Sequence, residues 1–151
     1  MKTFESLADV AACVGQEVAV SNWVTITQEQ VNRFAEATGD HQWIHVDVER
    51  AKAGPFGAPI AHGFLTLSLL PVFFESALDI KGSIMGVNYG LNRVRFTSPV
   101  PVGSRLRARL TLQACDAIEH GGRQMTWGVV VEREGADKPV CFAESLVRRY
   151  P

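Results

Sequence analysis

Hydrophobic and polar residues follow helical spacing in much of the first half of the chain and alternate in much of the second half. Apolar residues at helical spacing predict a short amphipathic helix over residues 4–14, and alternating valines predict a strand over residues 17–24. Residues 60–78 carry apolar side chains on every side, which predicts a helix that is buried all round. Pro71 removes one backbone hydrogen bond, so we expect this helix to be kinked or split there.

Start and stop signals define another helix, which follows the first predicted strand. Thr27 and Gln30 form a capping box at its start, and Gly39 suits the left-handed position that closes a helix. Asp40 therefore follows a well-fixed helix end, where its carboxylate can be held in a defined place. The Gly and Pro residues of the segment 47–59 prevent a long regular element there.

The second half of the chain is predicted to form a sheet. A strand with a bend at Gly90 is expected over residues 83–96, and arginines alternate with apolar residues over 105–110, as in a half-buried strand. Two further strands are expected over residues 125–134 and 140–150. The order of elements favours an α+β fold in which an antiparallel sheet packs on a buried helix. Such a sheet leaves strand edges that must be covered or paired, so we expect a homodimer.

Length and composition are those of one globular domain that spans residues 1–151. Hydrophobic residues make up 46% and charged residues 21%, which excludes wholesale disorder, and the net charge of −1 argues against nucleic acid as a partner. The three cysteines, Cys13, Cys115 and Cys141, fit neither a disulfide framework nor a metal-binding motif. The N-terminal segment lacks a signal-peptide core, and no apolar run approaches the roughly 18 residues that span a bilayer. We therefore expect a cytoplasmic protein without a membrane partner.

An acid and a base, Asp40 and His45, lie five positions apart after the capped helix. A carboxylate and an imidazole that converge on one water can take its proton and return a proton elsewhere, and histidine suits this task because its ordinary pKa lies near neutrality. The alternative is structural, with Asp40 capping a turn and His45 a satisfied histidine in a short extended piece. The position between a rigid helix end and the start of the next helix favours the catalytic interpretation.

His62 and Gly63 stand at the start of the apolar helix. The N–H groups of a first helical turn have no intrahelical acceptor, so the Gly63 N–H and the helix dipole can stabilise negative charge that develops on a carbonyl oxygen. Gly63 can equally be required for close packing against a strand. Spacing alone leaves both interpretations open.

A metal site is a weaker interpretation of the same segment. Its ligands would be histidines and an aspartate: His41, His45, His62, and Asp40 or Asp47. The first two histidines are separated by what reads as a turn rather than by one helical face, so we expect no metal. A nucleophilic mechanism is disfavoured because Thr66 and Ser68 lie within a helix that has no nucleophile-elbow motif.

Two segments, GDHQWIHVD at 39–47 and PIAHGFLTLSLL at 59–70, resemble the signature of the MaoC-like dehydratase family, which has the form GDxNPxHxD followed by PIAHGxxxxSL. The later segment VNYGLNRVRFTSPVPVGSRL is similar to the strand and loop that follow the central helix in these proteins. The likeness extends from about residue 21 to residue 150 and points to the (R)-specific enoyl-CoA hydratases, also called hydratase 2.

The resemblance implies a hot-dog fold, in which a curved antiparallel sheet wraps around one long central helix and two subunits join into a continuous sheet. It implies that Asp40 and His45 are the catalytic pair, that Gly63 supplies the oxyanion-hole N–H, and that no metal or other cofactor is needed. We also expect substrate contacts from five further residues: Trp43, His62, Asn88, Asn92 and Arg93. The implied substrate is an acyl-CoA thioester, with acyl-carrier protein as an alternative carrier, bound in a tunnel at the dimer interface.

The chain departs from the family pattern in two places. The usual Asn-Pro between the acid and the histidine is Gln42-Trp43. Some members use a helix serine to orient the acid, and this chain has Pro71 there, with Ser68 or Thr66 as candidate replacements. Neither change removes a group that the chemistry requires.

The sequence thus predicts the reversible hydration of a trans-2-enoyl-CoA to a (3R)-hydroxyacyl-CoA. A hot-dog thioesterase, which hydrolyses the same thioester, is the alternative enzyme. A non-catalytic subunit of a heterodimeric dehydratase is the alternative from another class, and the presence of both Asp40 and His45 argues against it.

Overall fold

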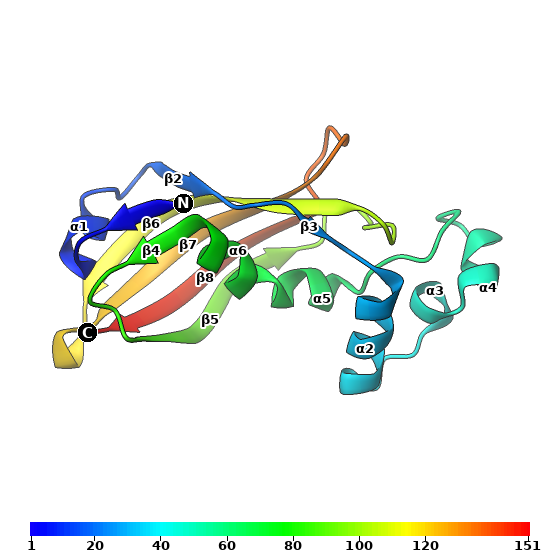
Figure 1. Ribbon diagram of the computed structural model, residues 1–151, viewed down its shortest axis with the longest axis horizontal. Helices are drawn as coiled ribbons and strands as arrows, with labels where there is room; N and C mark the ends of the chain where they lie inside the picture. The colour runs from blue at the N-terminus through cyan, green and yellow to red at the C-terminus, as the bar shows by residue number, and fades with distance from the viewer.

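A six-stranded antiparallel sheet packed on two short helices forms the body of the protein (Figure 1). The computed structural model describes all residues, 1–151. Five strands follow the order β2-β6-β7-β8-β5, and β3 also pairs with β6. The strands are β2 (Glu17–Val20), β3 (Val24–Thr25), β5 (Met85–Arg95), β6 (Arg105–Ala117), β7 (Arg123–Arg133) and β8 (Cys141–Tyr150). The predicted α+β layout is confirmed, and the predicted bend appears as a register shift between Asn88 and Gly90.

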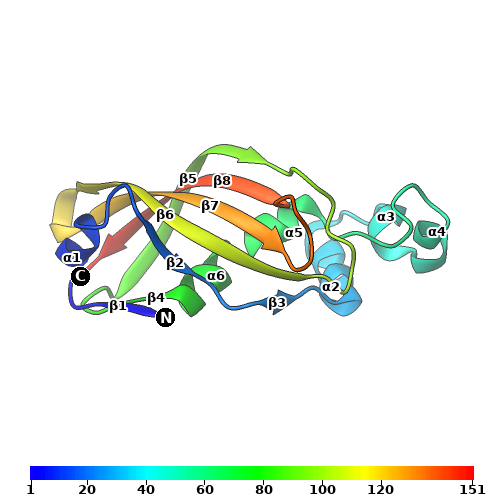
Figure 2. The ribbon, with the colours of Figure 1, turned by 90° about the horizontal axis from the view of Figure 1, so that it is seen from above.

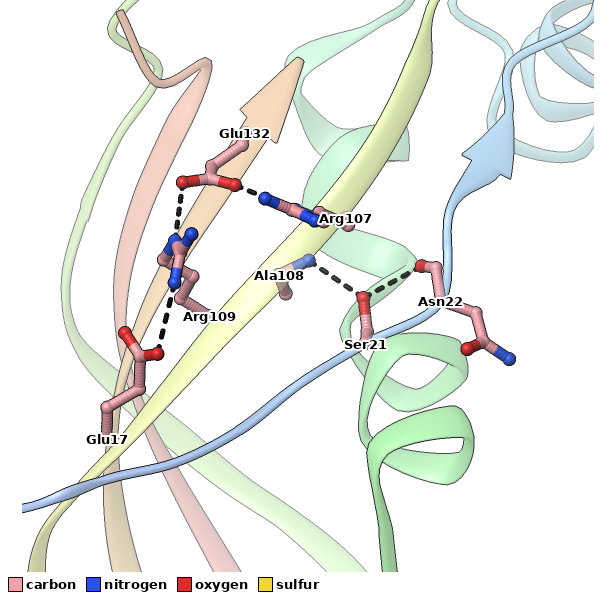
Figure 3. Close-up of polar contacts among 7 residues, drawn as sticks. All are labelled: Glu17, Ser21, Asn22, Arg107, Ala108, Arg109 and Glu132. Atoms are coloured by element: carbon pink, nitrogen blue, oxygen red, sulfur yellow. Dashed lines mark hydrogen bonds and ion pairs between the residues drawn. The ribbon is translucent and has the colours of Figure 1, made fainter. Parts of the chain in front are cut away.

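The alternation along β6 divides the sheet into a buried and an outer face. Leu106, Ala108 and Leu110 are fully buried, whereas the arginines between them face outward. On the outer face Arg107 and Arg109 both pair with Glu132, at 2.9 and 2.6 Å (Figure 3). The period of two in the sequence therefore sets which face meets the core.

Between β2 and β3, a serine side chain takes the place of a backbone carbonyl as a hydrogen-bond acceptor for β6. The Ser21 hydroxyl accepts from the Ala108 N–H at 2.8 Å and donates to the Asn22 carbonyl at 2.9 Å (Figure 3). The strand predicted over residues 17–24 is consequently two short strands, because the chain leaves the ladder between β2 and β3.

The central apolar segment forms two helices, α5 (Gly63–Ser68) and α6 (Leu70–Ala77). Pro71 lies in the first turn of α6, so the predicted split is confirmed. The prediction that the segment is buried all round is wrong for this chain, because Phe64 is 68% and Val72 is 43% exposed. The buried residues of the two helices, Phe73 among them, pack on the inner face of the sheet, and the sheet of one chain covers only that side of the helices.

The N-terminal segment is not one helix over residues 4–14. Strand β1 (Lys2–Phe4) pairs in parallel with β4 (Leu78–Ile80), and helix α1 spans only Leu7–Ala11. The reason is local: the Ser6 hydroxyl accepts from the Asp9 N–H at 3.2 Å and so caps a helix that begins after Phe4 has entered a strand.

Three helices lie beyond one end of the sheet (Figures 1 and 2). They are α2 (Gln28–Thr38), α3 (Trp43–Val46) and α4 (Val48–Lys52). The predicted caps of α2 are confirmed: the Thr27 hydroxyl accepts from the Gln30 N–H at 3.2 Å, and Gly39 has a φ of 83°. Helix α3 was not predicted, and it carries His45. No helix of the chain is both long enough and apolar enough to span a bilayer.

Candidate active site

His45 is a buried histidine whose ring is held by a main-chain carbonyl. It is 6% exposed, and its Nδ1 lies 2.6 Å from the Ile60 carbonyl oxygen. A carbonyl only accepts, so Nδ1 carries the proton and the neutral ring presents a lone pair on Nε2. The Gln28 amide donates to the His45 carbonyl at 2.8 Å, and the Ile60 N–H donates to the Ile44 carbonyl at 3.0 Å. Helix α3 is thereby tied both to α2 and to the segment before α5.

His62 lies directly against His45. The two ring centroids are 3.8 Å apart with 25° between the ring planes, and the Phe34 ring lies 4.9 Å from His62. His62 is 2% exposed, its Nε2 donates to the Asp40 carbonyl at 3.0 Å, and its Nδ1 has no hydrogen-bond partner.

Asp40 is exposed and begins the turn that follows α2. Its Oδ1 accepts from the Gln42 N–H at 3.3 Å, so the structural interpretation of Asp40 as a turn cap is part of the picture. The same carboxylate and one ring nitrogen each of His45 and His62 lie within 4.8 Å of one another. The fold therefore brings the predicted acid and the predicted base together.

A cavity of about 170 Å³ adjoins this cluster. His45, Gly63, Thr66 and Phe96 are among the residues that line it, whereas Asp40 lies at the exposed side of the cluster and is not in the lining. Gly63 is the first residue of α5, so its N–H has no intrahelical acceptor. A Cβ added at Gly63 would lie 2.7 Å from Cδ2 of Phe96. Both earlier interpretations of Gly63 thus hold geometrically, because the position needs a glycine for packing and also presents a free amide beside the cavity.

Burial, the largest influence, lowers the pKa of His45 below its ordinary value. The hydrogen bond to Ile60 and the charge of Asp40 act in the opposite direction, and neighbouring His62 adds to the lowering. His45 is therefore neutral near pH 7, with its Nε2 able to accept a hydrogen bond.

Comparison with known proteins identifies this arrangement. Residues 9–134 match the MaoC like domain. The chain is 59% identical over 148 residues, 98% of each chain, to the 3-hydroxyacyl-thioester dehydratase Z of Mycobacterium tuberculosis. It is 49% identical over 140 residues to the nodulation protein N of Rhizobium meliloti, covering 91% of this chain and 87% of that protein.

The chain belongs to the MaoC-like dehydratase family. A solved R-hydratase, PhaJ1 of Pseudomonas aeruginosa, superposes with a TM-score of 0.72 at 25% identity, covering 96% of this chain and 85% of that one. The predicted hot-dog fold is confirmed, with the central helix in two pieces, and the MaoC-like chain is a hydro-lyase.

The orientation of the rings in this cluster argues against a bound metal ion. The three ligand atoms of Asp40, His45 and His62 are close, but the lone pairs of two stacked rings lie in nearly parallel planes. An ion at the usual Zn–N distance of about 2.1 Å cannot lie in both planes. His41 is outside the cluster, and Asp47 caps α4 by accepting from the Arg50 N–H at 3.1 Å.

The residues expected to contact substrate are dispersed. Asn88, Asn92 and Arg93 are on β5 and do not line the cavity at His45, and the Asn92 amide donates to Glu144 at 2.9 Å. Asn88 instead lines two cavities along α6, of about 430 and 330 Å³. Trp43 opens α3, where the Arg50 guanidinium stacks on its ring at 4.3 Å. A substrate role for these residues stays a prediction.

The candidate replacements for the family's helix serine are now distinguished. Ser68 is engaged, because its hydroxyl donates to the Phe64 carbonyl at 2.7 Å. Thr66 is 2% exposed, lines the cavity, and has no partner for its hydroxyl. Pro71 lies farther along, in the lining of the two cavities beside α6.

Two supports of His45 were missed in the sequence. The Ile60 carbonyl left no signal, because every residue has one. Gln28 left a weak signal: it stands one helical turn before Asn32, and its amide joins the Asn32 side chain at 2.9 Å as well as the His45 carbonyl.

Proposed function

We propose that this MaoC-like chain hydrates trans-2-enoyl thioesters reversibly to (3R)-hydroxyacyl thioesters. The proposal rests on one observation: a carboxylate, an imidazole and a backbone N–H lie close together. Asp40 and His45 approach within 4.8 Å, and His45 shares the lining of a cavity with the first amide of α5, that of Gly63. The relative named 3-hydroxyacyl-thioester dehydratase and the R-hydratase neighbour support the substrate class and the (3R) product.

The neutral His45 ring is suited to orient and activate water. Its Nε2 accepts a hydrogen bond from a water, whose oxygen forms the bond to C3 of the enoyl group. Asp40 is the group that exchanges a proton with the substrate at C2. As the C3–O bond forms, Asp40 takes one proton from the water and passes it to C2, so Asp40 and His45 each end the reaction in the protonation state in which they began.

The Gly63 N–H is proposed to stabilise the thioester oxygen. This oxygen gains negative charge as the C2–C3 double bond is attacked, and a fixed N–H at a helix start is an effective donor to such charge. Buried apolar residues that line the cavity, including Ile60, Ala61 and Val100, exclude water and strengthen that interaction.

The testing experiment uses the purified chain with a short trans-2-enoyl-CoA and, in parallel, the same acyl group on acyl-carrier protein. Loss of enoyl absorbance with a (3R)-hydroxyacyl product and no free thiol is the expected result. Release of free thiol would instead identify the alternative thioesterase. No turnover of either carrier by the chain alone would favour the non-catalytic subunit.

The homodimer is proposed from the free edge of the sheet. Strand β5 is hydrogen-bonded only to β8 and leaves its other edge open over 11 residues. Its exposed side chains include Val87, Tyr89 and Leu91, and exposed Phe64 lies on the nearby α5. Long apolar edges of this kind recruit another strand, and a second copy is the simplest source.

Light scattering after gel filtration tests this assembly. We expect twice the chain mass for the wild type and the monomer mass for Leu91→Lys, which places a charge on the open edge. An unchanged dimer in Leu91→Lys and Tyr89→Lys would exclude β5 as the interface.

A further inference from the structure

His62 contacts both members of the proposed catalytic pair without lining their cavity. Its Nε2–H reaches the main chain of Asp40 at 3.0 Å, and its ring stacks on His45 at 3.8 Å. The three residues come from three separate places in the chain: the turn after α2, helix α3 and the start of α5. Among the hydrogen bonds and ring contacts of the protein, those of His62 alone join Asp40 and His45.

We propose that His62 is a positioning residue for hydration: it ties the Asp40 turn to the start of α5 and fixes the plane of the His45 ring. The inference rests on the proposed function, and it differs from the substrate-binding role that the sequence suggested for His62. The carboxylate and the imidazole belong to segments joined by a short turn, so their relative placement depends on what holds each of them from outside.

Packing alone does not account for a histidine at this position. The site is apolar on one side, with the Phe34 ring 4.9 Å away, and a phenylalanine would keep a ring there but would turn a C–H edge, not an N–H, toward the Asp40 carbonyl. The histidine also leaves Nδ1 buried without a donor, which a phenylalanine would avoid. What the imidazole alone supplies is the N–H that holds the Asp40 carbonyl.

The ring of His62 is held in one direction, because only its Nε2–H has a partner, the Asp40 carbonyl, while Nδ1 has none. The neighbouring imidazole also contributes to the lowered pKa of His45, to which burial contributes more.

Two substitutions separate the two contacts. His62→Gln keeps an N–H at a reach similar to Nε2 and loses the ring, whereas His62→Phe keeps a stacked ring and loses the donor. We expect kcat to fall about 100-fold in His62→Phe, because small misplacement of reacting groups has effects of this size, and to fall less than tenfold in His62→Gln. KM should change less than threefold in both, since His62 does not touch the cavity.

Two further readouts exclude a merely structural role. His62→Phe should unfold at a temperature close to that of the wild type, because the loss of the hydrogen bond to Asp40 is offset by the removal of a buried unpartnered nitrogen. The acid limb of its kcat/KM profile should move to higher pH, because the neighbouring imidazole that disfavours a charged His45 is gone. The control is His41→Gln, an exposed histidine of the same turn, which should match the wild type.

The outcomes distinguish this inference from the proposed function. Wild-type turnover in His62→Phe, a change in KM with kcat unaltered, or activity that only follows the folded fraction would each overturn the positioning role and leave hydration standing. A wild-type protein that hydrates no enoyl thioester would overturn the proposed function itself.

Discussion

Charged side chains on the outer face of the sheet are paired with one another, whereas several buried polar atoms at the site after α2 have no hydrogen-bond partner. On the sheet, Arg109 bridges Glu17 and Glu132, and Arg107 shares Glu132 (Figure 3). At the site, three buried polar atoms have no partner: Gln28 Oε1, His62 Nδ1 and Thr66 Oγ1. The other two such atoms of the protein, Ser83 Oγ and Arg133 Nε, lie elsewhere. Unpartnered buried groups cost stability, so three of them around His45 point to function.

The largest effect is expected from the acid and base. Asp40→Asn and His45→Ala should each lower kcat/KM by about 100-fold or more, because each removes a group that handles a proton. The folded state should be barely affected by Asp40→Asn, since Asp40 is exposed. Steady-state assays with circular dichroism as the folding control measure both quantities, and folded variants with near-normal turnover would contradict the assignment.

A substitution at Gly63 tests packing against chemistry. In Gly63→Ala the new methyl would lie 2.7 Å from the Phe96 ring, so we expect a loss of about 1–3 kcal/mol in the free energy of unfolding and reduced turnover. The double variant Gly63→Ala with Phe96→Ala provides room for the methyl and keeps the amide N–H. Its turnover should recover toward that of Phe96→Ala alone. A failure to recover would show that the methyl itself obstructs the substrate.

Because the pKa of His45 is lowered, we expect both the stability and the activity of the protein to depend on pH. Its pKa lies below the ordinary 6.5, chiefly because the ring is buried, so the folded chain binds fewer protons than the unfolded chain just below pH 6.5. This contribution to stability is therefore lost as the pH falls through that window. The acid limb of the kcat/KM profile should also lie below pH 6.5, and the loss of stability in this window should be absent from the unfolding curves of His45→Gln.

The two regions also differ in how far sequence could predict them. The alternation of arginine and apolar residues in β6 and the caps of α2 gave their elements directly, because both depend on local spacing. The short helix at His45 was not predicted, since its four residues depend on tertiary bonds from Gln28 and Ile60. Spacing assigned Phe4 to a helix. In the structure Phe4 is in a strand that pairs with Ile80, and local spacing cannot show a partner so distant in the sequence.

At the site, too, features set by local sequence could be predicted and those set by tertiary contacts could not. The pairing of Asp40 with His45 was predicted from their place after a capped helix and from the family resemblance. The stacking of His62 on His45 was not predicted, because the 16 residues between them fold through α4 and a Gly/Pro-rich loop whose path no periodicity sets. The residues on β5 that were expected to contact substrate do not line the cavity of their own chain. Their substrate role is therefore a prediction to be tested in the proposed dimer.

The smallest effect is expected on the sheet. Glu132→Gln weakens the bonds to Arg107 and Arg109, but all three side chains are about one-third exposed, so water and salt already screen the charges. We expect a loss of about 1 kcal/mol or less in the free energy of unfolding by urea, shrinking further at high salt, with kcat unchanged. Glu134→Gln is the matched control, because its pair with Arg105 is more exposed and should matter still less. A large drop in turnover in Glu132→Gln would show that the outer sheet face is coupled to the site, and the division between the two regions would not hold.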